Sequence, residues 1–96
     1  MINDTFHQKA EEHVKLLKLY TPILARVHGP NHPELAEVNE LVKSLTDKIE
    51  KKDAELTEEF GKLREVSGNY EVPSDGCETY EAVYTMLSEL DEAYSN

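Results

Sequence analysis

The chain has 96 residues, enough for one small domain near the lower size limit of a self-sufficient hydrophobic core. Its 39% apolar and 31% charged residues are typical of a soluble folded protein, and twenty acids against ten bases give a net charge of −10. An acidic chain is repelled by nucleic acid and by anionic membrane surfaces, which excludes both as main partners. No apolar run is long enough to cross a bilayer. A single cysteine and the absence of a signal-peptide pattern predict a cytoplasmic protein without an intramolecular disulfide.

Apolar residues at helical spacing predict an all-α domain of three helices, at about residues 4–27, 33–66 and 75–94. Segments rich in Gly, Pro, Asn and Ser separate them at residues 29–33 and 67–76. In the first helix, one stripe recurs at alternating spacings of three and four residues, and we expect it to face the core. Its members are Phe6, Ala10, His13, Leu17, Tyr20, Leu24 and Val27.

The second predicted helix carries apolar residues seven apart, a pattern typical of a seam between paired helices. These residues are Leu35, Val42, Ile49, Leu56 and Leu63. Lys52 and Glu59 interrupt the companion position of the same repeat. This helix would be about 50 Å long, whereas the first helix would reach only about 36 Å. We therefore expect an incomplete four-helix bundle that a second copy completes, with the chain forming a homodimer.

The third predicted helix is acidic on its outside. No Lys or Arg follows Arg64, while eight Asp and Glu residues do. A solvated face explains this charge most simply, and a docking surface for a basic partner is the alternative. Cys77 falls on the apolar face of this helix, where we expect it to pack in the core. No nucleophile–base pair is visible in the sequence, so an enzymatic function is not expected.

Histidines and a glutamate supply the candidate metal ligands. They are His7, Glu11, His13, His28 and His32. Helical bundles bind iron through inward-facing imidazole and carboxylate groups, and Glu11 lies one helical turn after His7. His7 and His28 would lie about 31 Å apart on a straight helix, so one ion cannot use both within one chain. His28 and His32 flank the first turn, where structural capping roles compete with ligation.

Two strings in the sequence resemble the iron-sulfur cluster repair di-iron proteins, a hemerythrin-like family of stress proteins. The first is FH at residues 6–7 followed by VHGPNHPEL at residues 27–35. The second is YEVPSDGCETY at residues 70–80, which is similar to the family's segment before its last helix. The resemblance implies a four-helix bundle. It also implies a role in repairing iron-sulfur clusters after nitric oxide or peroxide damage, with a di-iron centre held by histidines and two glutamates.

Carrying the family's ligands over by position retains only His7. The positions of the second-helix ligands hold Lys52 and Leu56, the third-helix histidine would fall near Thr57, and the last two ligands would lie beyond Asn96. The family also has many more residues between the second and third ligand regions. The resemblance thus implies a shortened member lacking most metal ligands, in which two helices of the bundle have merged and one chain cannot build the di-iron centre.

Two functions remain open from the sequence. In the first, the chain serves iron-sulfur proteins under nitrosative or oxidative stress and binds iron at a site shared by two copies. Antiparallel pairing would then bring ligands near the start of one first helix close to His28 or His32 of the other copy. In the second, the chain is a metal-free interaction module that dimerises through the central helix.

Overall fold

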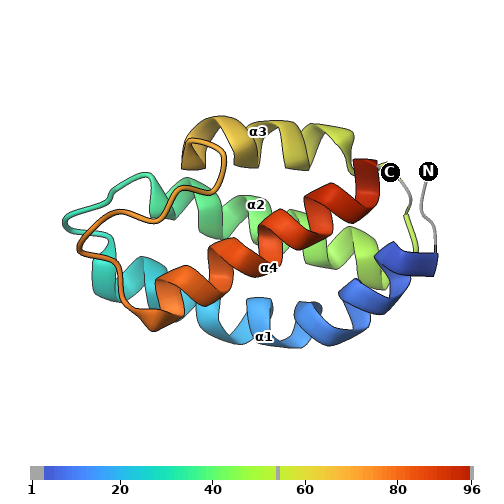
Figure 1. The fold of residues 1–96 in the computed structure, drawn as a ribbon, viewed down its shortest axis with the longest axis horizontal. Coiled ribbons are helices and arrows are strands. Elements are labelled where there is room, and N and C mark those ends of the chain that lie inside the picture. The colour runs from blue at the N-terminus through green and yellow to red at the C-terminus, as the bar shows by residue number, and fades with distance from the viewer. Residues whose placement is uncertain (1–3, 54, 96) are drawn as a thin grey trace.

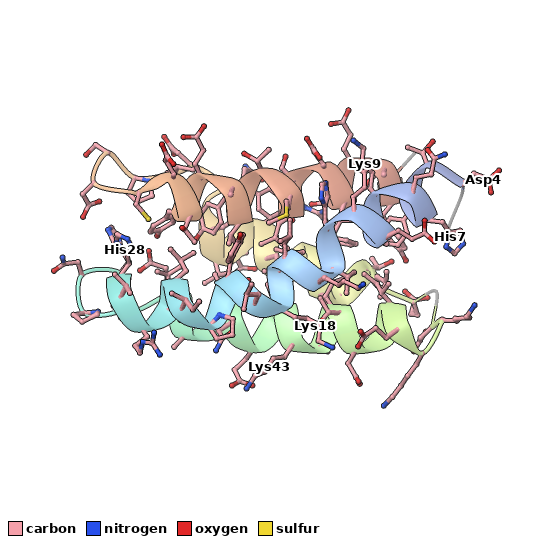
Figure 2. All side chains as sticks on the ribbon, turned by 90° about the horizontal axis from the view of Figure 1, so that it is seen from below. Asp4, His7, Lys9, Lys18, His28 and Lys43 are labelled. Atoms are coloured by element: carbon pink, nitrogen blue, oxygen red, sulfur yellow. The ribbon has the colours of Figure 1, made fainter. Side chains whose placement is uncertain are left out.

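The computed structural model describes residues 4–53 and 55–95, which form four α-helices and contain no strand. The helices are α1 (Asp4–His28), α2 (Leu35–Glu50), α3 (Thr57–Ser67) and α4 (Glu78–Ser95). Successive helices run in opposite directions, with α1 beside α2 and α4, and α3 on the far side of α2 (Figures 1 and 2). The predicted all-α class is confirmed, and the predicted number of three helices is wrong. None of the helices in the described ranges combines the length and apolar composition that crossing a bilayer requires.

The helix predicted over residues 33–66 is interrupted by a turn between α2 and α3. Lys52 has a φ of 61°, a left-handed backbone conformation that ends a helix. The side-chain Oδ1 of Asp53 then accepts the backbone N–H of Glu55 at 2.9 Å, which holds the turn. Leu56 follows with its side chain fully buried, so α3 folds back against the rest of the bundle instead of extending α2.

The seven-residue repeat is buried within the chain's own core. Leu35, Val42, Leu56 and Leu63 are each at most 2% exposed, and Ile49 is partly buried against the same core. After the turn, the second half of the repeat contributes to the core from a different helix than the first half. The predicted dimer seam is therefore not a free surface, because its side chains already pack together inside one chain.

The buried face of α1 is rotated relative to the predicted stripe. Its buried residues are Phe6, Ala10, Val14, Leu17, Thr21 and Leu24. Val14 is buried where the pattern predicted His13, which is only half-buried. Thr21 is buried where it predicted Tyr20. Val27 is 62% exposed and lies outside the core altogether. The rotation leaves several apolar side chains of α1 on the outside.

An ion pair with one buried partner joins α3 to α4. The Arg64 guanidinium donates to both carboxylate oxygens of Asp91, at 2.6 and 2.8 Å, and the Tyr70 hydroxyl donates to the same carboxylate at 2.7 Å. Asp91 is only 6% exposed, and burial together with this hydrogen bond raises the pKa of Tyr70. One acid of the predicted solvated face therefore holds the fold together.

Candidate functional site

The two segments that carry the family resemblance meet at one end of the bundle. Residues 29–34 connect α1 to α2, and residues 68–77 connect α3 to α4. The two connections lie side by side at the left of Figure 1, and Figure 2 labels His28 at this end and His7 at the opposite end of α1. Two segments that are separated in the sequence by all of α2 and α3 thus form one surface.

Each connection contains a glycine that its backbone requires. A Cβ atom at Gly29 would collide with the carbonyl oxygen of Ala25, one turn back in α1. A Cβ atom at Gly76 would collide with a methyl group of Val72, and the Gly76 N–H donates to the Pro73 carbonyl at 2.9 Å in the same turn. Only glycine fits at these two positions, because both turns are tight.

Cys77 and His28 form a side-chain pair on this surface. The Cys77 Sγ lies 3.3 Å from the His28 Nε2, and the thiol is exposed. The His28 ring stands edge-on to the buried ring of Tyr80, with centroids 5.3 Å apart. The prediction that Cys77 packs in the core is wrong, because α4 begins at Glu78 and the cysteine lies on the connection before it.

His32 and Asp75 form a second pair beside the first. The His32 Nε2 lies 2.9 and 3.1 Å from the two carboxylate oxygens of Asp75, and its Nδ1 lies 3.5 Å from Glu34. Its ring also contacts Tyr80, with centroids 5.7 Å apart. The hydrogen bond with His32 is the main reason that the pKa of Asp75 is below its usual value. Tyr80 therefore positions both histidines.

A thiol beside an imidazole can act as a nucleophile. Together, the thiol and the imidazole can also serve as two ligands for a borderline metal such as iron. The neighbouring carboxylates add negative charge, which attracts cations to this end of the bundle. In residues 4–53 and 55–95, no three His, Cys, Asp or Glu side chains converge closely enough to hold a metal ion. The two pairs can therefore supply part of a coordination shell, and the remaining ligands must come from another molecule.

The other predicted ligands lie elsewhere. His7 is exposed and, with Glu11 and Lys52, lines a depression of about 800 Å³ between the start of α1 and the end of α2. His13 lies in the middle of α1, where its Nε2 is 2.7 Å from the Glu89 carboxylate, and this hydrogen bond lowers the pKa of Glu89. The five predicted ligands thus lie in three separate places. His7 and Glu11 share one, His28 and His32 share another, and His13 lies apart from both.

The end of the bundle near His7 has an apolar interior. Phe6, Phe60 and Tyr94 pack together there with ring centroids 5.3 to 6.4 Å apart. Leu56, at a position where the family resemblance places a ligand, is fully buried, and its backbone N–H donates to the Tyr94 hydroxyl at 3.0 Å. The residues present do not fit a di-iron centre within one chain, because aromatic and aliphatic side chains fill this interior.

The Cys77–His28 pair was not predicted from the sequence. The two residues are 49 positions apart, so no local spacing rule could join them. The one signal available was that both belong to strings resembling the same family. Since those strings meet in the fold, the resemblance indicates the site better than the spacing of histidines along α1 does.

Sequence comparison identifies relatives of this chain. A protein of Staphylococcus haemolyticus named iron-sulfur cluster repair protein ScdA is 26% identical over 124 residues, covering 94% of this chain and 56% of the relative. Proteins of the same name from two strains of Staphylococcus epidermidis are 36% identical over 75 residues, covering 74% of this chain and 32% of each relative. The chain therefore spans little more than half the length of the first relative and about a third of the others. No family model matches the chain, and no solved structure does.

The first of these alignments is longer than the chain itself. Its 124 residues exceed the 96 of this sequence, so the Staphylococcus haemolyticus protein has residues inside the aligned region that have no counterpart here. This agrees with the expectation, drawn from the family resemblance, that the chain is a shortened member.

Proposed function

The chain belongs to the iron-sulfur cluster repair family, and we propose that it serves repair by taking up ferrous iron at the Cys77–His28 pair. Clusters of client proteins that nitrosative or oxidative stress has damaged require iron for their repair. Iron is here a cargo that is bound and passed on, and the chain has no resident di-iron centre of its own. The observation that carries the proposal is the 3.3 Å contact between the exposed Cys77 Sγ and the His28 Nε2.

The chemistry of the pair suits iron that must be released again. A thiolate and an imidazole both bind ferrous iron, and two ligands hold it less firmly than the closed shells of structural sites do. Binding releases the Cys77 thiol proton to solvent, and the client or a small thiol supplies the remaining ligands. Asp75 and Glu34, both close to His32, add the negative charge that favours a cation at this surface.

The proposal retains His28 and His32 from the five predicted ligands. His28 would bind the metal directly, and His32 would orient Asp75 beside it. His7, Glu11 and His13 lie away from this surface, so they serve as controls in the test of the proposal.

Anaerobic titration with cobalt(II), a spectroscopic substitute for ferrous iron, tests the site. Wild-type protein should show a thiolate-to-cobalt charge-transfer band that saturates at one ion per chain. Cys77→Ser should abolish the band, and His28→Gln should weaken binding about tenfold or more. His7→Gln, which removes an exposed imidazole elsewhere on α1, should leave the titration unchanged.

Activity provides a second readout. A cluster-containing hydratase inactivated by nitric oxide should recover faster with iron and wild-type protein than with iron and the Cys77→Ser variant. The proposal fails if Cys77→Ser binds cobalt as the wild type does, or if His7→Gln weakens binding while His28→Gln does not.

A second candidate function is a metal-free interaction module. The observation that favours it is the set of apolar side chains left on the outside of α1. Normal recovery of the hydratase with the Cys77→Ser variant would support this function over iron uptake, because the protein would then act without its thiol.

A further inference from the structure

A cavity of about 250 Å³ lies between α1 and α2. Figure 2 labels Lys18, one of its lining residues, part of the way along α1 between His7 and His28. The inner wall of the cavity includes Leu17 and Val42, which are at most 2% exposed. The cavity therefore reaches the core, and it is separate from the proposed iron site.

Two buried polar atoms at this cavity have no hydrogen-bond partner among the residues that the structure describes. They are the Oγ1 of Thr21, a residue that is 1% exposed, and the Oδ1 of Asn39. Thr46 lines the same cavity and is also buried, yet its hydroxyl donates to the Val42 carbonyl at 2.8 Å. The Thr21 hydroxyl thus differs from that of its neighbour. A buried polar atom without a partner is costly, so a molecule that pairs with both atoms should bind here.

Water alone fits this cavity poorly. One buried water needs two to four polar partners and only about 10 to 15 Å³ of such space, so the cavity has room for a larger molecule. Much of its lining is apolar, from Leu17, Pro22 and Val42. Pro22 has no N–H, so the Lys18 carbonyl on the same side of α1 lacks its usual helical donor. The site thus combines apolar walls with a few polar atoms, as sites for small molecules do.

The charged residues that line the cavity already have ion-pair partners. Lys18 and Glu50 pair with each other at 2.9 Å at the rim, and Lys43 and Asp47 each pair with a residue close by in the sequence. A charged ligand would have to displace one of these partners and would lose its hydration on entering. An uncharged ligand avoids both costs.

We propose that the cavity binds a small uncharged molecule with a carboxamide group and an apolar body. A carboxamide has N–H donors and a carbonyl acceptor side by side. Its N–H groups match the Asn39 Oδ1, and its carbonyl matches the Thr21 hydroxyl as a donor. The apolar body would contact Leu17 and Val42 on the inner wall.

NMR titration of the protein with benzamide tests the proposal, with toluene as an apolar probe of similar shape. Wild-type protein should bind benzamide with a dissociation constant of about 1 mM, a value expected for a ligand of this size. The shifted signals should come from residues around Thr21 and Asn39. Toluene should bind more weakly, because it leaves both polar atoms unpaired.

Thr21→Val keeps the shape of the side chain and removes its hydroxyl. It should weaken benzamide binding about three- to tenfold without weakening toluene binding. Thr46→Val is the matched control, because it removes a hydroxyl that its own helix already satisfies, and it should leave benzamide binding unchanged. Asn39→Leu removes the second polar atom and should also weaken benzamide binding. Cys77→Ser should have no effect, since the cavity is independent of the iron site.

The absence of shifts around Thr21 and Asn39 at tens of millimolar benzamide would mean that water alone fills the cavity, and it would overturn the proposal. A Thr21→Val variant with the affinity of the wild type would do the same, as would a Thr46→Val variant that loses as much affinity as Thr21→Val. Circular dichroism checks that each variant remains helical. If Thr21→Val does not, Asn39→Leu decides, because Asn39 is only partly buried and its replacement disturbs the core less.

Discussion

Arg64→Met and Asp91→Asn break the same ion pair and should destabilise the protein by different amounts. The Arg64 side chain is 43% exposed, whereas that of Asp91 is only 8% exposed. Without Arg64, the buried Asp91 carboxylate keeps only the Tyr70 hydroxyl as a partner, and the loss should be about 3 kcal/mol. Without the carboxylate, Arg64 can be hydrated and the new amide still accepts a hydrogen bond. The cost of Asp91→Asn should therefore be about 1 to 1.5 kcal/mol.

Urea unfolding followed by circular dichroism measures both free energies of unfolding. Lys62→Met is the matched control, because it breaks the exposed pair of Lys62 with Glu58 in the same helix and should cost less than about 0.5 kcal/mol. The reasoning is refuted if Asp91→Asn costs as much as Arg64→Met. It is also refuted if both variants lose no more free energy of unfolding than the control does, since α3 would then not be held to α4 by a buried carboxylate.

Three further predictions concern the core, the pH dependence and a helix end. Phe60→Ala should lower the free energy of unfolding by about 3 to 4 kcal/mol, because the ring is buried in the core. Leu19→Ala, at an exposed position, should change it by less than about 0.5 kcal/mol, and equal urea midpoints for the two variants would contradict this. The hydrogen bond with His13 lowers the pKa of Glu89 below 4.5, so its stabilising contribution is complete above that value and is lost as the pH falls through the lowered pKa. Melting temperatures should therefore drop more steeply in acid for wild type than for Glu89→Gln. Gly68→Ala should cost about 1 kcal/mol in urea unfolding, because Gly68 ends α3 with a φ of 62° and no neighbouring atom would collide with the added methyl group.

The all-helical class followed from sequence patterns, whereas the break between α2 and α3 did not. The seven-residue repeat continues in register through Leu56 and Leu63, so hydrophobic periodicity alone predicts one helix. The available signal was Lys52, a charged residue in the repeat followed by Asp53, which favours turns. Tertiary packing decides the outcome, because Leu56 and Leu63 bury more surface when α3 folds back than they could on an extended helix.

The orientation of α1 shows a different limit of sequence reasoning. The helix has apolar residues on two faces, one ending in Leu24 and the other in Val27. A periodic pattern identifies both faces and does not say which one meets the rest of the chain. The predicted stripe combined residues of both faces. It included Tyr20 and Val27, which are not buried, and it omitted Thr21, which is.

The candidate site could be predicted in part. His28 and His32 were identified as possible ligands from their residue type, and the family resemblance drew attention to the string around Cys77. Their proximity depends on how the α1–α2 and α3–α4 connections meet, which is a property of the whole bundle. Long-range proximity of this kind leaves no trace in the spacing of residues along one chain.

The measurement that tests this account most directly is a nuclear Overhauser experiment on the ring protons of Tyr80. The structure places the rings of His28 and His32 against Tyr80, with centroids 5.3 and 5.7 Å away, and sets Cys77 against His28. We predict cross-peaks from Tyr80 to both histidine rings, and from the His28 ring to the β-protons of Cys77. If these are absent while the cross-peaks between Tyr80 and Tyr84, 5.1 Å apart, are present, the two connections do not form one surface and the proposed iron site does not exist.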